Sequence, residues 1–185
     1  MVYYFRGNIN FFHGNRSLKN LAYVWIFQNL LLAFSAAYKN LIYIQEFSLT
    51  YKRIGVFVYL LLTVIGLITT YQKLSRRRTL WYLLHINTWS VVVILFISSF
   101  ISWDIFITRH NLQRSNKPDF KYLINLSNAN IPLLVPYLES AQLEENEKQA
   151  LTEKIETFKS VEIAQSWLSW NYQDYLITRS LDNEE

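Results

Sequence analysis

The feature that most constrains this chain is an apolar stretch of eighteen residues without a charge, running from Ile54 to Tyr71. As an α-helix it would be about 27 Å long, because each residue adds about 1.5 Å, and this is close to the hydrocarbon thickness of a bilayer. Lys52 and Arg53 precede the stretch, and Gln72 and Lys73 follow it. A core helix of a soluble protein seldom runs so far without a charge. The stretch therefore predicts a transmembrane helix.

Two further apolar stretches flank this one, so the sequence predicts three spans at about residues 21–44, 54–71 and 80–107. Aromatic residues stand at both ends of the third stretch, as they do at membrane interfaces. The predicted fold class is all-α, with three transmembrane helices followed by a small polar helical C-terminal region. The chain then divides into an interfacial lead-in at 1–20, a three-span membrane region at 21–110 and an acidic helical tail at 111–185.

Composition supports this division of the chain. Hydrophobic residues make up 51% of the sequence and charged residues only 17%, against about 25% charged in a typical soluble protein. Residues 1–117 hold thirteen Lys and Arg but two acids, whereas residues 118–185 hold five Lys and Arg and twelve acids. A soluble helical protein with a large core is the alternative. The split in charge favours two regions with different surroundings.

The acidic tail is expected to fold as four short helices at 119–126, 131–141, 144–161 and 166–181. Pro132 and Pro136 interrupt the second of these. The third begins with acidic residues, which favour the positive end of a helix dipole. Its apolar residues recur at helical spacing, and they are Ala150, Leu151, Ile155 and Phe158.

A dense basic loop separates the second and third predicted spans. Its charges are Lys73, Arg76, Arg77 and Arg78. Such clusters in short loops orient membrane proteins by staying on the cytoplasmic side, which favours an N-terminus inside and a tail outside. The loops are otherwise almost balanced in charge, so the orientation stays open. Basic residues beside apolar spans meet anionic lipid headgroups, and we therefore predict no nucleic-acid partner.

The polar side chains that stand out inside the predicted spans are Gln28 and Asn29 in the first, and His85 and Asn87 in the third. Polar groups at that depth need hydrogen-bond partners, so they are expected to face neighbouring helices. For His85 a metal ligand or a proton carrier is the alternative to such a contact.

A polar cluster is predicted at one membrane face, where the first loop and the end of the third span would meet. Its members are Glu46, Thr50, Arg53, Asp104, Arg109 and His110. Opposite charges at a membrane boundary can hold helices together, bind an anion or relay protons. The plainer interpretation is that they mark the ends of the spans. Asp104 lies close to apolar residues and is expected to need a cation as its partner.

No constellation in the sequence indicates a reaction, a cofactor or a metal. There is no cysteine, and His13, His85 and His110 lack the spacing of metal ligands. With four glycines, no phosphate-binding loop is recognisable, and no serine lies in a nucleophile elbow. We therefore predict no catalytic residue and do not favour an enzyme, although His85 or His110 could serve as the base of a membrane transferase.

Four short stretches lie in a fixed order between residues 43 and 175, and they are YIQEFSLTYKRIGV (43–56), WDIFITRHNL (103–112), DFKYLINLSNANIPLL (119–134) and WLSWNYQDY (167–175). They resemble segments of an uncharacterised bacterial multi-pass membrane family, a domain of unknown function in the 4153/4173 group. Matching positions are Tyr43, Leu49, Thr50, Arg53, Asp104, Arg109, Asn111, Asp119, Tyr122, Leu123, Pro132, Trp170 and Asn171.

This chain departs from the family pattern at three places. The family's Tyr-Gly is Phe47-Ser48 here, its Tyr after Arg is His110, and its Asp-Ala is Ala129-Asn130. Losing the glycine puts a tight turn in doubt, and losing the aspartate puts a carboxylate role in the tail in doubt. The resemblance implies a bacterial inner-membrane location, a helical tail and further spans upstream, so that this chain would be the C-terminal part. It implies no catalytic residues.

Two functions are compatible with these observations. The first is a membrane scaffold, sensor or accessory component without a reaction of its own. The second is a transport or proton-relay unit that uses the polar cluster. Either would have the lipid bilayer as a partner, together with other membrane helices or a second copy of the chain.

Overall fold

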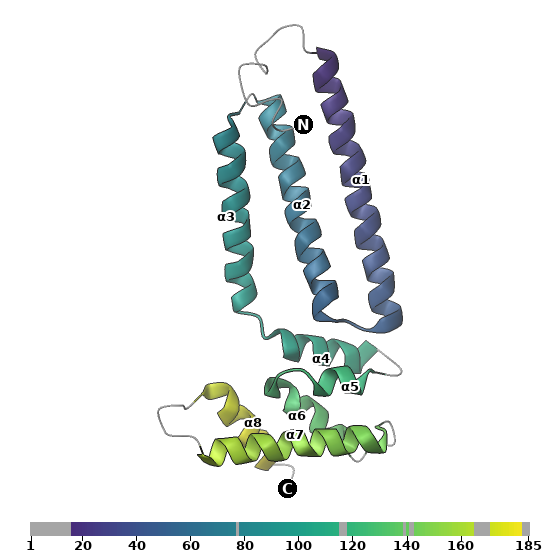
Figure 1. Ribbon diagram of the computed structural model, residues 1–185, viewed down its shortest axis with the longest axis vertical. Helices are drawn as coiled ribbons and strands as arrows, with labels where there is room; N and C mark the ends of the chain where they lie inside the picture. Colours follow the sequence, from purple (N-terminus) through teal and green to yellow (C-terminus); the bar gives the residue numbers. More distant parts are fainter. Residues whose placement is uncertain are drawn as a thin grey trace. The chain divides into compact units, whose positions relative to one another are not determined.

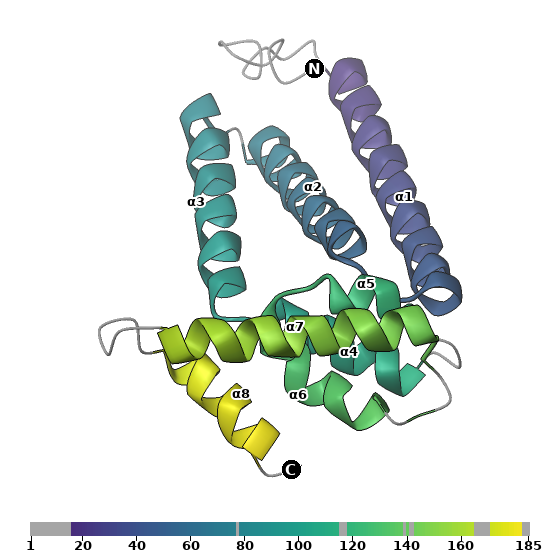
Figure 2. The ribbon, with the colours of Figure 1, turned by 60° about the horizontal axis from the view of Figure 1, so that its bottom comes forward.

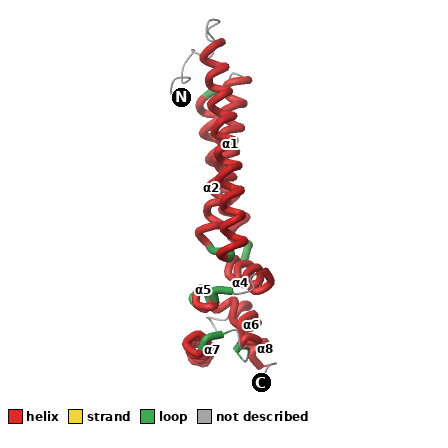
Figure 3. The backbone as a smooth tube through the Cα atoms, turned by 90° about the vertical axis from the view of Figure 1, so that its right-hand side faces the viewer, coloured by secondary structure: helices red, strands yellow, loops and turns green. Residues whose placement is uncertain are grey.

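The computed structural model describes residues 16–76, 78–114, 118–138, 140, 143–164 and 171–182, and every regular element in these ranges is a helix (Figure 3). The all-α prediction is therefore confirmed, with three long apolar helices followed by shorter ones. The chain forms two compact units, residues 1–101 and 102–185. Most of the predicted lead-in, residues 1–15, lies outside the described residues.

The N-terminal unit consists of α1 (Arg16–Phe47), α2 (Tyr51–Ser75) and α3 (Leu80–Ser99). Short connections make neighbouring helices antiparallel, and α2 lies between α1 and α3 (Figure 1). All three are long and apolar enough to cross a membrane. The first two extend beyond the predicted spans because charged residues end the hydrocarbon-compatible stretch without ending the helix.

Large apolar side chains of this unit point outward. Phe27 is 61% exposed, Tyr59 69% and Phe96 64%. Few side chains in each span are buried, which differs from a soluble bundle that encloses its apolar residues. Such a surface fits acyl chains as its solvent, since exposed apolar groups carry no penalty in hydrocarbon.

The end of the third predicted span requires a correction. The sequence predicts one helix over 80–107, but α3 ends at Ser99 and α4 (Trp103–Arg114) is separate. The Ser99 hydroxyl donates to the Phe96 carbonyl at 2.7 Å, and the Ser102 carbonyl accepts from the Phe106 amide at 3.1 Å, as at the start of a new helix. Hydropathy alone misses this break because serine hydroxyls compete locally for backbone groups.

The connection between α1 and α2 is a tight turn of three residues, 48–50. Ser48 has φ of 71°, the left-handed conformation that favours glycine. Leu49 is buried, and the Asn40 amide donates to the Arg53 carbonyl across the hairpin at 3.0 Å. The tight turn that the missing glycine put in doubt therefore forms here with serine.

Replacing Ser48 with Gly should stabilise this hairpin by about 0.5–1 kcal/mol, because a Cβ atom is unfavourable at positive φ. The measurement is thermal unfolding of the detergent-solubilised chain. Ser48→Ala keeps the Cβ atom and serves as the control, which should show no gain. Equal melting temperatures for Ser48→Gly and the wild type would contradict the expected strain.

Among the described residues, the C-terminal unit contains α4 and six further helical elements (Figure 2). These are α5 (Phe120–Ile124), η2 (Asn128–Asn130), α6 (Ile131–Leu134), η3 (Val135–Tyr137), α7 (Glu145–Ala164) and α8 (Tyr172–Asp182). They follow the four predicted tail helices closely, although residues 165–170 lie outside the described ones. A core of its own holds the unit together, formed by Ile131, Phe158, Ile177 and Leu181.

Candidate functional site

A lysine lies at the centre of the best-defined polar site, which is in the C-terminal unit. The Lys154 ammonium on α7 donates to the carbonyls of Ile124 and Leu126, each at 2.8 Å, and to that of Ser127 at 3.2 Å. It also donates to Oδ1 of Asn130 at 3.1 Å. We call the set Asp104, Thr108, Ser127, Asn130 and Lys154 the lysine network.

The local structure explains why a lysine is placed there. Asp119 begins α5 by accepting the Tyr122 amide at 3.0 Å, and the helix ends five residues later. The carbonyl of its last residue, Ile124, has no intrahelical donor, and those of Leu126 and Ser127 follow just beyond the helix. A cation satisfies the hydrogen bonds of all three and suits the negative end of the dipole. Lys154 follows Leu151 by three residues and so lies on the side of α7 that packs inward.

Asn130 joins the lysine to α4. Its amide nitrogen donates to the Leu123 carbonyl at 2.7 Å and to the Thr108 hydroxyl at 3.1 Å, while its oxygen accepts from Lys154. Asn130 and Thr108 are completely buried. Buried polar groups of this kind stabilise a unique packing only when all are satisfied. The network therefore fixes α4, α5, η2 and α7 as one body.

Asp104 completes the network at the start of α4. Its carboxylate accepts a hydrogen bond of 2.5 Å from the Ser127 hydroxyl. Burial lowers the pKa of Lys154 to about 8, and the nearby Asp104 carboxylate acts in the opposite direction by favouring the ammonium form. Asp104 was expected to need a cation as its partner, and the Lys154 ammonium is a cation that interacts electrostatically with its carboxylate.

This arrangement suits a structural role more than a reaction. A lysine ammonium has three protons, and four oxygen acceptors lie within 3.2 Å of Lys154 Nζ. No proton of the ammonium is left over for a ligand. Among the described residues, no group of three His, Asp or Glu side chains could hold a metal ion.

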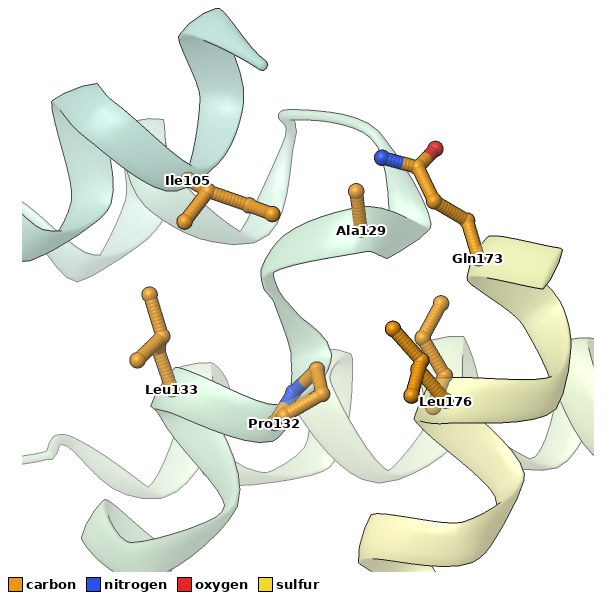
Figure 4. A pocket seen from close by; sticks show the side chains of 7 residues that line it. Ile105, Ala129, Pro132, Leu133, Gln173 and Leu176 are labelled. Carbon is orange, nitrogen blue, oxygen red and sulfur yellow. The ribbon is translucent and has the colours of Figure 1, made fainter.

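Among the described residues, two cavities adjoin the network in the same unit. One of about 460 Å³ opens beside Lys154 and is lined in part by Asn125, Asn128, Glu153 and Thr157. The other, of about 240 Å³, is apolar and lies between α4, α6 and α8 (Figure 4). Its walls are Ile105, Ala129, Pro132, Leu133, Gln173, Leu176 and Ile177.

The predicted polar cluster is divided between the two units. Glu46, Thr50 and Arg53 belong to the N-terminal unit, and Asp104, Arg109 and His110 to α4. Glu46 and Arg109 are exposed. Whether the six side chains meet stays a prediction.

Two members of that cluster have notable surroundings. The Arg53 guanidinium lies over the Phe47 ring at 5.8 Å, and its Nη1 is buried without a hydrogen bond in the part of the chain that the structure describes. His110 stacks on Phe106 at 6.4 Å between ring centroids. Burial, together with the positive charge of Arg114, lowers the pKa of His110, so its neutral form is favoured.

The predicted intramembrane polar residues have different environments. Asn87 accepts a 3.4 Å hydrogen bond from Thr69 of α2, as a helix–helix contact requires. Asn29 instead donates to the Trp25 carbonyl of its own helix at 2.8 Å. His85 lies on the exposed surface of α3 between Trp81 and Trp89, at 6.1 and 6.2 Å. Gln28 is exposed.

The basic residues that were predicted to orient the chain in the membrane also differ in their exposure. Lys73 belongs to the last turn of α2 and is only 1% exposed, whereas Arg76 and Arg78 are exposed. Arg78 lies over the Tyr82 ring at 5.4 Å. Arg77 lies outside the described residues.

A family model matches residues 3–137, well over half of the chain, and its description is "Domain of unknown function (DUF4153)". The chain belongs to the DUF4153 family. No curated protein and no solved structure matches it. The DUF4153 match contains the three membrane-capable helices and the elements from α4 to η3, but not α7. Lys154 therefore reaches the network from beyond the matched region.

Lys154, Asn130 and Thr108 are not among the site residues predicted from the sequence. A signal for Lys154 was present, because a lysine three residues after Leu151 and four before Phe158 interrupts an apolar stripe. Asn130 appeared only as a departure from the family pattern. Its partners are distant in sequence, so no spacing could indicate them.

Proposed function

We propose that this DUF4153 protein is a component of the bacterial inner membrane without a reaction of its own, acting as a scaffold, sensor or accessory subunit. Three apolar helices would anchor it, and the C-terminal unit would serve as the part that other molecules contact. The observation that carries the proposal is the outward display of large apolar side chains along all three helices.

The lysine network supports a structural role for the C-terminal unit. The protons of the Lys154 ammonium are donated to main-chain and amide oxygens, so they hold the fold and are not available to a ligand. Outside this network, α7 begins with Glu145 and Glu147, which give that end of the helix an acidic surface. A preformed, acidic unit on a membrane anchor suits contact with another protein.

Chemical crosslinking in native membranes tests this proposal. We expect the chain to be recovered with a second copy or with other membrane proteins, and to resist alkaline extraction. A chain that withstands extraction but recovers no partner at all would contradict the scaffold role.

A transport or proton-relay function is the second candidate, and one observation favours it. Arg53 Nη1 is buried without a hydrogen bond in the described part of the chain, so an anionic group could pair with it. In reconstituted vesicles, this function requires a proton or ion flux that Asp104→Asn or Arg53→Gln reduces. Vesicles that show no flux above empty controls would exclude it.

A further inference from the structure

One side of α1 carries a line of polar residues. The line begins at Gln28. Counted from that residue, Ser35 lies seven residues further along the chain, Lys39 eleven and Glu46 eighteen. At 100° per residue they lie within about 20° of a single line along the helix. All four are exposed. The buried residues of α1 lie about 120–160° further round, and they are Ala22, Ile26, Ala33 and Asn40.

This line lies on the side of α1 that faces away from α2. Within the N-terminal unit, α2 is the helix that packs on α1, and α1 forms the edge of the layer (Figure 1). A lipid-facing surface at such an edge should be uniformly apolar. The polar line is therefore a departure that needs a physical reason.

Depth in the membrane separates the four residues into two pairs. Lys39 and Glu46 lie towards the C-terminal end of a 32-residue helix, where long side chains reach water. Gln28 lies seven residues, or about 10 Å, inside the apolar stretch that begins at Leu21. Ser35 lies about two turns further along the same line.

The side-chain amide of Gln28 has no hydrogen bond in the part of the chain that the structure describes. Its neighbour Asn29 is satisfied by the Trp25 carbonyl, which shows that the helix can provide for an amide when the geometry suits. An amide left without a partner in hydrocarbon is unfavourable, because no water is available there. A second helix carrying a polar group at the same depth would remove this cost.

We propose that a second copy of this chain packs against this side of α1, forming a parallel two-fold dimer with Gln28 at its centre. The inference rests on the membrane insertion in the proposed function. Two copies inserted in the same direction place Gln28 opposite its counterpart at equal depth. An amide is both donor and acceptor, so the two side chains are self-complementary.

The remaining residues of the line are compatible with this dimer. The small Ser35 side chain allows close approach of the two helices and adds a hydroxyl. The two Lys39 side chains would carry like charges, but each can turn away into the headgroup region. Polar contacts would thus lie at the centre of the interface and charges at its wet edge.

The absence of cysteine from the sequence makes a direct test possible. In intact membranes under mild oxidation, Ser35→Cys should give a disulfide-linked dimer, because such a bond requires Cα atoms within about 7 Å. Phe34→Cys is the matched control, since it is also exposed but lies about 100° away around the helix. It should crosslink much less.

A second variant tests the role of the amide. Gln28→Leu should raise the dissociation constant of the dimer about threefold to tenfold, measured by energy transfer between labelled chains in vesicles. Gln28→Asn should restore part of the affinity, which a purely apolar contact would not show. Equal crosslinking of Ser35→Cys and Phe34→Cys, or crosslinking of Ser35→Cys only to a different protein, would overturn the dimer.

Alkaline extraction separates failure of this inference from failure of the proposed function. If the chain stays in the membrane but the Ser35→Cys dimer does not form, the dimer alone is wrong. If the chain is extracted into the aqueous phase, both the dimer and the membrane anchor are wrong.

Discussion

Replacing Lys154 with Met is expected to lower the free energy of unfolding of the C-terminal unit by about 2–4 kcal/mol. Methionine keeps the apolar stem but leaves the carbonyls of Ile124 and Leu126 and the amide oxygen of Asn130 without their donor. Hydrogen exchange of α5 and α7 in the detergent-solubilised full chain measures this. Amides that exchange through opening of the unit should exchange about 30- to 1,000-fold faster.

Lys148→Met is the matched control, because it removes a lysine from the same helix and has no side-chain hydrogen bond among the described residues. Exchange in that variant should match the wild type. If Lys154→Met also matched the wild type, the network would hold nothing together.

The difference in stability between the wild type and Lys154→Met should depend on pH with a defined sign. The pKa of Lys154 is about 8 in the folded chain, below its ordinary value of 10.5. Between these values the folded state binds fewer protons than the unfolded state, so this group makes the unit more stable as pH rises. The stability of the wild type relative to Lys154→Met should therefore increase from pH 8 to 10.5 and stay constant below pH 8.

Replacing Leu61 with Arg is expected to impair membrane insertion of α2 strongly, by about 2.5–3.5 kcal/mol. Leu61 lies near the middle of the uncharged stretch and is 51% exposed. On the surface of a soluble protein this change would cost almost nothing. The inserted fraction after translation with membranes, scored by alkaline extraction, measures the effect.

Ser75→Arg is the control for this substitution. Ser75 is exposed at the last residue of α2, next to Arg76, where a further positive charge meets headgroups and water. Insertion should be unchanged. If Leu61→Arg and Ser75→Arg inserted equally well, water would be the solvent of the exposed face of α2.

For Asp104, the sequence predicted that a cation is needed but not which residue provides it. Its position among apolar residues indicates a need for a positive charge, and Lys154, fifty residues later, supplies one that acts on it. Arg109 lies on α4 with Asp104 and much nearer to it along the chain, yet the Arg109 side chain is exposed. The folding of α7 beside α5 and η2 brings the lysine to the network, and no local spacing encodes that approach.

The sequence by itself determined the number of membrane-capable helices, the helical class of the tail and kinship with DUF4153 proteins, because these follow from the length, hydropathy and order of local segments. Only the tertiary structure decided where the third helix ends, that Ser48 takes a glycine-like conformation, and which carbonyls Lys154 satisfies. It also decided that Gln28 lies on the side of α1 that faces away from α2. These depend on hydroxyls competing for single backbone groups and on contacts between distant segments, which are three-dimensional properties that periodicity does not record.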